Sequence, residues 1–401
     1  MEKIHFENRA GMALAGTLEL PPGGDWHATA VFAHCFTCSR NIRAARDITR
    51  ALAQAGFAVL RFDFTGLGES EGDFADTSFS SNLDDLEDAA RWLGEHYGAP
   101  QLLVGHSLGG TAVLAVAERL ESVRALATLG APAGPEHVLK QFGAGLERIE
   151  AEGTAEVDLA GRTFRVRRDF IEDARGHSLE ERLGRLRRAL LVLHSPVDTV
   201  VSIEQAQKIF VAAKHPKSFV SLDDADHLLS RAADSAYAGG VIAAWAARFL
   251  ELASPEPVAG ARVSGLAADP FLCRVQAGPH RLVADEPADK GGTDQGPDPY
   301  QFLAAALGSC TVMTLNMYAR HKKLPVKRVR CEVTHRRVHA EDCADCDSSA
   351  GHIDELNRVI AIEGELDDAQ RARMLQIADR CPVHRTLESE IRIRSRLAGD
   401  Q

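Results

Sequence analysis

The sequence has no apolar run near the length of a membrane span, and its longest apolar segments are interrupted by charged residues. Residues 1–6 contain no apolar core of a secretory signal. An excess of basic residues is also missing. The formal net charge is −11, which disfavours nucleic acid or an anionic membrane as the main partner. We therefore expect a cytoplasmic protein without a membrane or nucleic-acid partner.

Cysteine is scarce as well. The chain has eight cysteines among 401 residues, which is too few for a disulfide scaffold. In a reducing compartment these residues would be free thiols, metal ligands or redox centres. Internal repeats and low-complexity tracts are absent. The length, with 45% hydrophobic and 26% charged residues, predicts two globular domains of ordinary size.

A short proline-containing segment marks the predicted boundary between the two domains. Residues 254–260 contain two prolines and a glycine, and the pattern of predicted elements changes after them. We expect the first domain at residues 1–253 and the second at residues 261–401.

Strands and helices alternate along the first domain, which predicts an α/β fold with a mostly parallel sheet. The predicted strands are residues 2–8, 12–20, 28–33, 57–62, 102–104, 123–129, 189–193 and 218–222, and the predicted helices are residues 42–54, 82–96, 111–120, 203–213 and 235–252. Residues 131–188 break the alternation with a helix at 136–150 and a hairpin at 156–166. An insertion between two sheet strands is where a lid over an active site would lie.

The most informative stretch is residues 102–110, where an apolar run leads into Gly-His-Ser-Leu-Gly-Gly and then into a helix-forming segment. A strand, a sharp turn and a helix with Ser107 at the apex resemble the nucleophile elbow of the α/β-hydrolase family. Gly105 and Gly109 provide the space that so tight a turn needs. The resemblance implies that Ser107 is a catalytic nucleophile. The alternative is a glycine-rich connection between a strand and a helix.

A serine hydroxyl needs a base to take its proton and a carboxylate to orient that base. In the α/β-hydrolase family the order along the chain is serine, acid, histidine, each after a strand. Asp198 and His227 match both the order and the placement, although a surface histidine is the alternative for His227. Asp224 and Asp226 are close to His227 in sequence and therefore reach its ring less easily.

The family also uses two backbone amides to hold the oxyanion. The Leu108 amide is one, and the resemblance of His34-Cys35-Phe36 to the family's His-Gly-x loop implies that Phe36 supplies the other. Residues 63–70 resemble the family's Asp-x-x-Gly-x-Gly-x-Ser loop. The α/β-hydrolase resemblance covers residues 1–250.

Cys35 and Cys38 form a Cys-x-x-Cys motif after a strand and before a helix, the placement of a thioredoxin-type dithiol. We favour the oxyanion loop as the role of this segment, with the two thiols incidental to it. Oxidation of the pair would distort the loop, so redox control of hydrolysis is an additional hypothesis.

The second domain separates its strands from its helices, which predicts an α+β fold. Strands are expected at residues 262–283, 326–338, 358–366 and 389–397, and helices at residues 300–323 and 367–380. In the first of these helices, three- and four-residue spacing places Cys310 on one face with Phe302, Ala306, Met313 and Met317. That pattern by itself favours a small buried cysteine facing a core.

Residues 296–310 and the segment Cys-Pro-Val-His-Arg-Thr-Leu at 381–387 resemble the OsmC/Ohr family, over about residues 260–400. The resemblance implies that Cys310 is a peroxidatic thiolate and Cys381 its resolving partner. In that family an arginine held by a glutamate activates the thiol. The glutamate position, ten residues before the cysteine, is Tyr300 here.

A loose group of cysteines and histidines lies in the second domain: His335, His339, Cys343, Cys346 and His352. Cys343 and Cys346 have the spacing of a zinc knuckle, but no second Cys-x-x-Cys pairs with them. A loop with two free thiols and a zinc site are the two alternatives.

Together, the resemblances predict a carboxylic ester or thioester hydrolase fused to a thiol-dependent organic hydroperoxide reductase that uses a dithiol reductant. The alternative is a hydrolase whose second domain is a non-catalytic dimerisation or ligand-binding module. OsmC-family domains form intertwined dimers, which implies a homodimer through residues 260–401. We expect no cofactor.

Overall fold

The structure is a computed structural model that describes residues 1–35, 38–159, 162–250, 256–339 and 352–398. Contacts between residues divide the chain into two compact units, Met1–Arg281 and Leu282–Gln401. This division falls after the expected linker at 254–260, because most of a small sheet that follows the linker is grouped with the first unit. The domain boundary at the linker stays a prediction.

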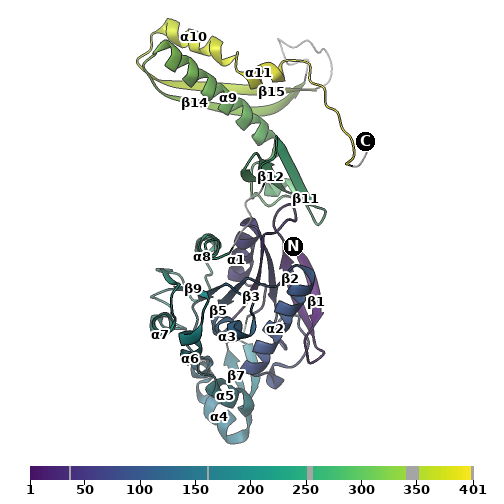
Figure 1. The fold of residues 1–401 in the computed structure, drawn as a ribbon, viewed down its shortest axis with the longest axis vertical. Helices are drawn as coiled ribbons and strands as arrows, with labels where there is room; N and C mark the ends of the chain where they lie inside the picture. Colours follow the sequence, from purple (N-terminus) through teal and green to yellow (C-terminus); the bar gives the residue numbers. More distant parts are fainter. Residues whose placement is uncertain (36–37, 160–161, 251–255, 340–351, 399–401) are drawn as a thin grey trace. The chain divides into compact units, whose positions relative to one another are not determined.

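An eight-stranded sheet forms the centre of the first unit (Figure 1). β2 runs antiparallel to both of its neighbours, and every other pair is parallel, which confirms the mostly parallel α/β prediction. The strands, in their order across the sheet, are β1 (Glu2–Glu7), β2 (Ala13–Glu19), β4 (Phe57–Phe62), β3 (Ala28–Ala33), β5 (Leu102–His106), β6 (Ala125–Leu129), β9 (Ala189–His194) and β10 (Lys217–Ser221). All residues of the five strands from β4 to β9 are buried, as expected for strands that are covered on both faces.

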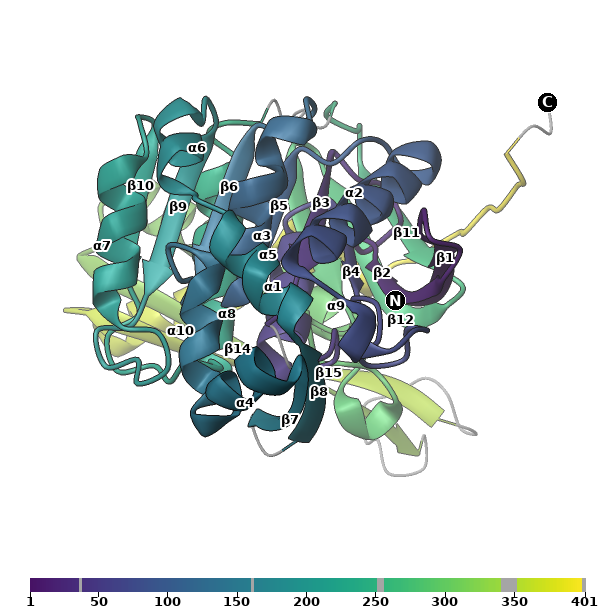
Figure 2. The same cartoon turned by 90° about the horizontal axis from the view of Figure 1, so that it is seen from below.

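Helices cover both faces of this sheet (Figures 1 and 2). One face packs against α1 (Arg43–Gln54) and α8 (Ala232–Ala246). The other packs against α2 (Phe79–His96), α3 (Leu108–Val116) and α7 (Ile203–Ala212). Two short 3₁₀ helices, η1 (Phe74–Asp76) and η2 (Ala117–Arg119), precede α2 and follow α3.

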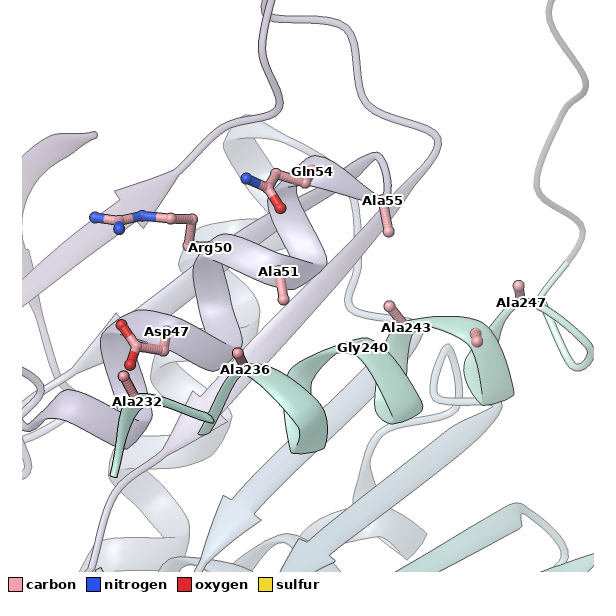
Figure 3. A pocket seen from close by; sticks show the side chains of 11 residues that line it. Asp47, Arg50, Ala51, Gln54, Ala55, Ala232, Ala236, Gly240, Ala243 and Ala247 are labelled. Atoms are coloured by element: carbon pink, nitrogen blue, oxygen red, sulfur yellow. The ribbon is translucent and has the colours of Figure 1, made fainter. Parts of the chain in front are cut away.

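α1 and α8 approach closely at Gly239, where an added Cβ would lie 2.7 Å from the Ala51 side chain. Elsewhere the two helices leave between them a groove of 740 Å³ that is lined mainly by alanines (Figure 3). Its described lining contains none of the residues predicted for catalysis. The packing of α1 and α8 therefore supports the sheet, and the groove between them is not the expected catalytic site.

The insertion lies between β6 and β9, as expected. Its elements are η3 (Pro135–Phe142), α4 (Ala144–Glu152), β7 (Thr154–Leu159), β8 (Arg162–Arg167), α5 (Arg168–Gly176) and α6 (Glu180–Arg185). The single helix predicted at 136–150 is wrong, because Gly143 has a φ of 50° and separates η3 from α4. Phe142, Phe164 and Phe170 of the insertion are buried in the same core as α2 and α3.

The second part of the chain is α+β, which confirms that prediction. β11 (Ala261–Leu266), β12 (Asp269–Ala277) and β13 (His280–Ala284) form a three-stranded sheet, and η4 (Ala288–Lys290) follows it. α9 (Pro299–Lys322) and α10 (Asp368–Ala378) pack on the antiparallel pair β14 (Val326–His339) and β15 (His352–Gly364). α11 (Pro382–Leu387) follows α10.

The strand predicted at residues 389–397 is wrong in this structure. The segment alternates apolar and polar residues, but it pairs with no strand among the described residues, and Ile393 is 88% exposed. A strand needs a neighbour to satisfy its backbone hydrogen bonds, so a periodicity of two is not sufficient by itself.

The buried face of α9 also differs from the predicted one. Leu307, Gly308, Thr311, Leu315 and Ala319 face the sheet and α10, whereas Cys310 is half-buried. Met313 and Met317, which were expected beside Cys310 in a core, are 64% and 73% exposed. The periodicity identified an apolar face correctly but not what covers it.

Among the described residues, α9 is the one helix long and apolar enough to cross a membrane by length and composition. The expectation that charges interrupt every long apolar segment is wrong for α9, whose basic residues are in its last turn. Core helices of soluble proteins share these features, although they are mostly buried. Only 22% of the apolar window of α9 is buried within this chain.

Candidate active site

Ser107 lies at the turn between β5 and α3 with φ 54° and ψ −126°, a backbone conformation that residues other than glycine rarely adopt. A Cβ on Gly105 would overlap the Gly109 carbonyl oxygen, and a Cβ on Gly109 would overlap the carbonyl oxygens of Ala33 and His34. The Ser107 amide donates to the Leu129 carbonyl oxygen at 2.8 Å. The strained turn therefore requires glycine at both flanking positions, as expected for an elbow.

Three loops bring the predicted catalytic residues together at the carboxyl ends of the parallel strands. His227 Nε2 lies 3.0 Å from Ser107 Oγ, and His227 Nδ1 lies 2.7 Å from Asp198 Oδ2. The three side chains follow β5, β9 and β10. This arrangement allows proton transfer from the hydroxyl to a histidine that a carboxylate orients.

The Asp198 carboxylate is held for this contact by its own loop. Its Oδ1 accepts hydrogen bonds from the amides of Val200 and Val201 at 2.8 and 2.9 Å. Burial acts to raise the pKa of Asp198, but the hydrogen bond and charge of His227 and the two amides hold that pKa below its ordinary value. The carboxylate is therefore ionised at neutral pH.

Asp224 and Asp226, the less favoured acids, contact other groups. Asp224 pairs with Arg231, and Asp226 accepts hydrogen bonds from the amides of Leu228 and Ser230. Both aspartates therefore stabilise the loop that carries His227.

The Leu108 amide is the first of α3, and the first amides of a helix have no acceptor within the helix. It is thus available to an oxyanion formed at Ser107. The other predicted donor, Phe36, lies outside the described residues.

Residues on both sides of Phe36 are fixed by the 63–70 loop. Asp63 accepts from the Arg40 amide at 2.6 Å and pairs with the fully buried Arg40 guanidinium. Arg40 also donates to Glu69 at 2.7 Å, and Ser70 Oγ donates to the Asp63 carbonyl oxygen at 2.6 Å. On the other side of Phe36, His34 donates from Nδ1–H to the Cys35 carbonyl oxygen at 2.7 Å, and its Nε2 lies 3.7 Å from Asp63.

Cys35 and Cys38 are joined by a disulfide bond, so of the alternatives considered for this pair the structure has the oxidised dithiol. The Cys38 amide also donates to the Cys35 carbonyl oxygen at 3.2 Å. The bonded pair and the assembled Ser107, His227 and Asp198 occur in the same structure.

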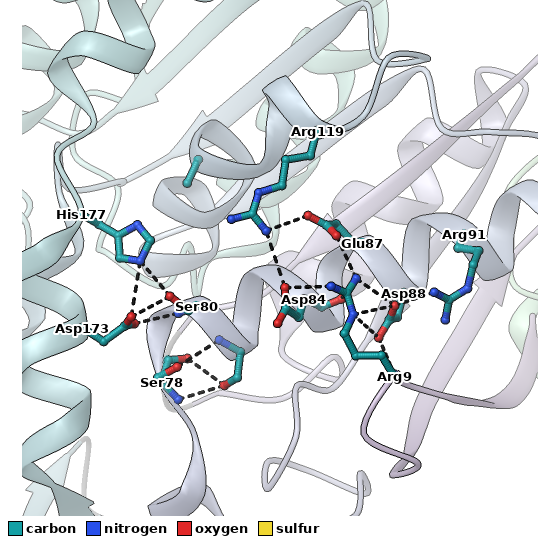
Figure 4. Close-up of polar contacts among 12 residues, drawn as sticks. Arg9, Ser78, Ser80, Asp84, Glu87, Asp88, Arg91, Arg119, Asp173 and His177 are labelled. Carbon is teal, nitrogen blue, oxygen red and sulfur yellow. Dashed lines mark hydrogen bonds and ion pairs between the residues drawn. The ribbon is translucent and has the colours of Figure 1, made fainter.

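A second group of serine, histidine and aspartate was not predicted from the sequence (Figure 4). Ser80 Oγ lies 2.9 Å from His177 Nε2, but it also donates to Asp173 at 2.6 Å. The Asp173 carboxylate accepts the hydroxyl hydrogen bond and lies 3.6 Å from the same His177 nitrogen that faces Ser80, whereas in a triad the acid contacts the other ring nitrogen. Because Ser80 lies in the first turn of α2 and Asp173 belongs to α5, the group anchors the insertion to α2.

In the second unit, Cys381 is fully buried and its sulfur accepts from the His384 amide at 3.3 Å. The Thr311 hydroxyl, one residue after Cys310, lies 3.7 Å from the same sulfur. Arg358 donates to this hydroxyl at 3.1 Å and to Asp379 at 2.7 Å. The sequence did not single out Arg358 or Asp379, because they come from different elements.

Tyr300, at the glutamate position of the OsmC/Ohr family, stacks on the His335 ring with centroids 4.1 Å apart, and His335 pairs with Asp354 at 2.9 Å. Cys343 and Cys346 lie outside the described residues. The part of the chain that the structure describes contains no group of three or more metal-ligating side chains. The zinc alternative therefore stays a prediction.

Comparisons with known proteins agree with this division of the chain. Residues 31–188 match the family model described as alpha/beta hydrolase fold, and residues 292–396 match the model described as OsmC-like protein. The crystal structure of the esterase domain from a Rhodothermus marinus protein is 47% identical, covers 62% of this chain and 98% of its own, and has a TM-score of 0.52.

Two more distant relatives match the same part of the chain. Est1E from Butyrivibrio proteoclasticus, solved with ferulic acid bound, shares the fold at 19% identity and a TM-score of 0.55, over 61% of this chain and 98% of its own. The palmitoyl-protein thioesterase ABHD10 of Rattus norvegicus is 26% identical over 217 residues, 51% of this chain and 70% of its own.

The elbow, the sheet and these matches agree on the class of the protein. Its first part is an esterase-like enzyme unit, and the OsmC-like match at residues 292–396 lies in the second compact unit. The chain belongs to the α/β-hydrolase family and carries a C-terminal OsmC-like domain.

Proposed function

We propose that the first unit hydrolyses carboxylic esters or thioesters through Ser107, His227 and Asp198. The observation that carries this proposal is the continuous pair of hydrogen bonds, 3.0 and 2.7 Å long, from the elbow serine through the histidine to the aspartate. The depressed pKa of Asp198 keeps the carboxylate negative beside the ring that becomes positive during the reaction.

The proposed reaction has two halves. His227 Nε2 takes the Ser107 proton as Oγ attacks the acyl carbon, and the Leu108 and Phe36 amides stabilise the oxyanion. His227 then gives its proton to the leaving alcohol or thiol, which leaves an acyl-serine. Water, deprotonated by the same nitrogen, attacks that acyl group and releases the carboxylic acid.

Both relatives with a substrate-related name support an acyl substrate. One structure holds ferulic acid, and the other protein is named a palmitoyl-protein thioesterase. Phenylalanine and leucine side chains lie around the elbow and in the insertion, among them Phe64, Leu67 and Phe142. We therefore propose small or medium apolar acyl groups on a neutral alcohol or thiol.

The test is a panel of p-nitrophenyl esters and acyl thioesters of two to sixteen carbons, assayed with the wild type, Ser107→Ala and Ser80→Ala. Removal of the nucleophile is expected to lower kcat by about 10⁴-fold or more. Ser80→Ala is the matched control, because this serine also contacts a histidine and an aspartate, and it is expected to stay within a few-fold. Hydrolysis that survives in Ser107→Ala would contradict the proposal.

For the OsmC-like domain, we propose thiol-dependent reduction of organic hydroperoxides. Cys310 attacks the O–O bond and becomes a sulfenic acid, while the other oxygen leaves as the alcohol after taking a proton. The Cys381 thiol then attacks the sulfenic sulfur, which gives a disulfide and water, and a dithiol reductant restores both thiols.

Arg358 supports this proposal as the arginine of the site. Its guanidinium is held by Asp379 and contacts the hydroxyl of Thr311, which touches the Cys381 sulfur. These contacts lead to the Cys381 sulfur, so in this proposal the Arg358–Asp379 pair positions the resolving cysteine, in a chain with Tyr300 at the glutamate position of the family.

Cumene hydroperoxide consumption with dithiothreitol by the full chain tests this activity. Cys310→Ser and Cys381→Ser are expected to abolish turnover, whereas Cys273→Ser, a free cysteine on β12, is expected to leave it unchanged. No consumption by the wild type favours the alternative, a non-catalytic dimerisation or ligand-binding module.

The exposed face of α9 and the unpaired residues 389–397 support a homodimer through this domain. Apolar residues on one helix face, among them the exposed Met313 and Met317, would be covered by a second copy. The alternating segment would gain a partner strand there. The dimer is compatible with either role of the domain.

A further inference from the structure

His106 is a buried titratable residue that the proposed reaction does not use. It is the last residue of β5 and directly precedes Ser107, and no part of its surface is exposed. Burial and the nearby His227 lower the pKa of His106 to about 3, so its imidazole is neutral at working pH.

The hydrogen bond of His106 fixes which nitrogen carries the proton. Nε2 lies 2.7 Å from the backbone carbonyl oxygen of His227. A carbonyl oxygen can only accept, so Nε2–H is the donor and the lone pair is on Nδ1. Within the described structure, Nδ1 is buried without a hydrogen-bond partner. The ring therefore makes one directed polar contact, and that contact is with the catalytic base.

This bond joins two segments that the sheet does not connect. β5 and β10 are separated in the sheet by β6 and β9, and the pairing of β10 ends at Ser221. The rings of His106 and His227 also lie close, with centroids 5.1 Å apart. The residue beside the nucleophile thus holds the main chain of the base.

The acid loop has a similar contact. His194, the last residue of β9 and fully buried, has Nε2 2.7 Å from the carbonyl oxygen of Val201. The Val201 amide in turn donates to Asp198 Oδ1. A buried neutral histidine at a strand end therefore fixes the backbone of each loop that orients the nucleophile.

We propose that His106 is a positioning residue of the hydrolase, whose Nε2–H fixes the His227 backbone so that the base stays within hydrogen-bond distance of Ser107. The inference rests on the proposed function. A displacement of about 1 Å in a catalytic group can cost about 100-fold in rate, so loss of this donor acts on kcat. Substrate binding does not involve His106, so KM is expected to stay within about threefold.

The test compares two replacements at one position. His106→Phe keeps a ring without a donor, and His106→Gln restores an amide donor near the place of Nε2. With p-nitrophenyl acetate, His106→Phe is expected to lower kcat by 10- to 100-fold, and His106→Gln to recover to within about fivefold of the wild type. His27→Gln is the control for replacement of a histidine in the same unit.

A second readout separates positioning from simple loss of stability. The rate of Ser107 labelling by a fluorophosphonate probe depends on the base and should follow kcat in both variants, at a temperature where thermal unfolding shows each variant folded. Equal kcat in folded His106→Phe and wild type would overturn the proposal. Equal losses of kcat in His106→Phe and His106→Gln would also overturn it, because the amide donor of glutamine would then not restore the rate.

The wild type provides a measurement that needs no variant. Nitrogen-15 spectra of histidine-labelled protein are expected to show His106 as the neutral Nε2–H form between pH 5 and 7. A proton on Nδ1 would overturn the proposal even if His106→Phe does not fold. Absence of Ser107 labelling in the wild type, with the Nε2–H form present, instead removes the proposed function, and the inference falls with it.

Discussion

The surroundings of Ser107 and those of Cys310 differ in how completely this chain encloses them. Ser107 lies where several strand ends of one sheet meet, and His227 and Asp198 reach it from loops of the same unit. Cys310 lies on α9, where one flank packs on β14 and β15 and another exposes Met313 and Met317. The site at the strand ends of the doubly covered sheet is completed by one chain, whereas the exposed flank of α9 is the surface that a second copy would cover in the proposed dimer.

The largest effect is expected from replacing Asp198, the acid of the Ser107 site. Asp198→Asn is expected to lower kcat by about 10⁴-fold, because the histidine loses the carboxylate that sets its tautomer and stabilises its charge. Asp224→Asn is the matched control and is expected to change kcat less than about threefold, since Asp224 pairs with Arg231. Equal losses in both variants would contradict the assignment of the acid.

Packing at the elbow is tested by adding one methyl group. Gly109→Ala would overlap two carbonyl oxygens, so we expect a loss of about 3 kcal/mol in the free energy of unfolding and of most hydrolysis. In Gly240→Ala the new methyl meets open space on α8, and a gain of about 0.5 to 1 kcal/mol is expected. Urea unfolding curves of the wild type and both variants measure these changes in the free energy of unfolding.

The incomplete surroundings of Cys310 are tested by charges on α9. Met313→Glu with Met317→Glu is expected to raise the dissociation constant of a dimer by about 100-fold, because two carboxylates would be buried without partners. Val211→Glu, at an exposed position of α7, is the control. Sedimentation velocity over a concentration series measures the shift, and a wild type that stays monomeric at all concentrations would contradict the dimer.

Acid is expected to destabilise the first unit through buried neutral histidines. With a pKa of about 3 when folded and 6.5 when unfolded, His106 binds more protons in the unfolded chain between these values. The free energy of unfolding therefore does not depend on His106 well above pH 6.5, and it falls by about 2 kcal/mol through this residue between pH 7 and pH 5. Asp198 has a depressed pKa, so its protonation lowers the free energy of unfolding only when the pH falls below about 3.8, the ordinary pKa of an aspartate.

The three tryptophans lie at positions 26, 92 and 245, so their fluorescence reports unfolding of the first unit. Urea midpoints at pH 7 and 5 give the pH dependence of the wild type and His106→Gln. The urea midpoint of His106→Gln is expected to fall less between pH 7 and pH 5 than that of the wild type. An identical difference in both proteins would show that the charge state of His106 does not change in this range.

The smallest expected effect concerns the Cys35–Cys38 bond. The bond occurs together with the assembled Ser107, His227 and Asp198, so the expected effect has the opposite sign to the redox hypothesis drawn from the sequence: reduction, which removes the cross-link between Cys35 and Cys38, is expected to lower kcat by two- to fivefold. Cys38→Ser is expected to have the lower rate with or without dithiothreitol. A wild-type rate that is the same in both conditions would leave hydrolysis independent of this pair.

Much of the fold could be predicted from the sequence because local patterns cause it. Continuous apolar runs produced the buried strands, and the glycines around Ser107 marked a turn without room for side chains. The helix predicted at 136–150 failed at one glycine, Gly143, whose positive φ ends η3. The strand at 389–397 failed because its pairing partner is not a local property.

Residue types and their order along the sequence determined the class of this protein and the candidate nucleophiles, because turn geometry and apolar periodicity act over a few residues. Only the tertiary structure decided that His227 lies 3.0 Å from Ser107, that His106 holds its backbone, and that Arg358 lies beside Thr311. These contacts join residues 47 to 121 positions apart, and the packing of the layers sets their distances. Periodicity shows which face of a helix is apolar, but the neighbouring surfaces decide whether that face is buried.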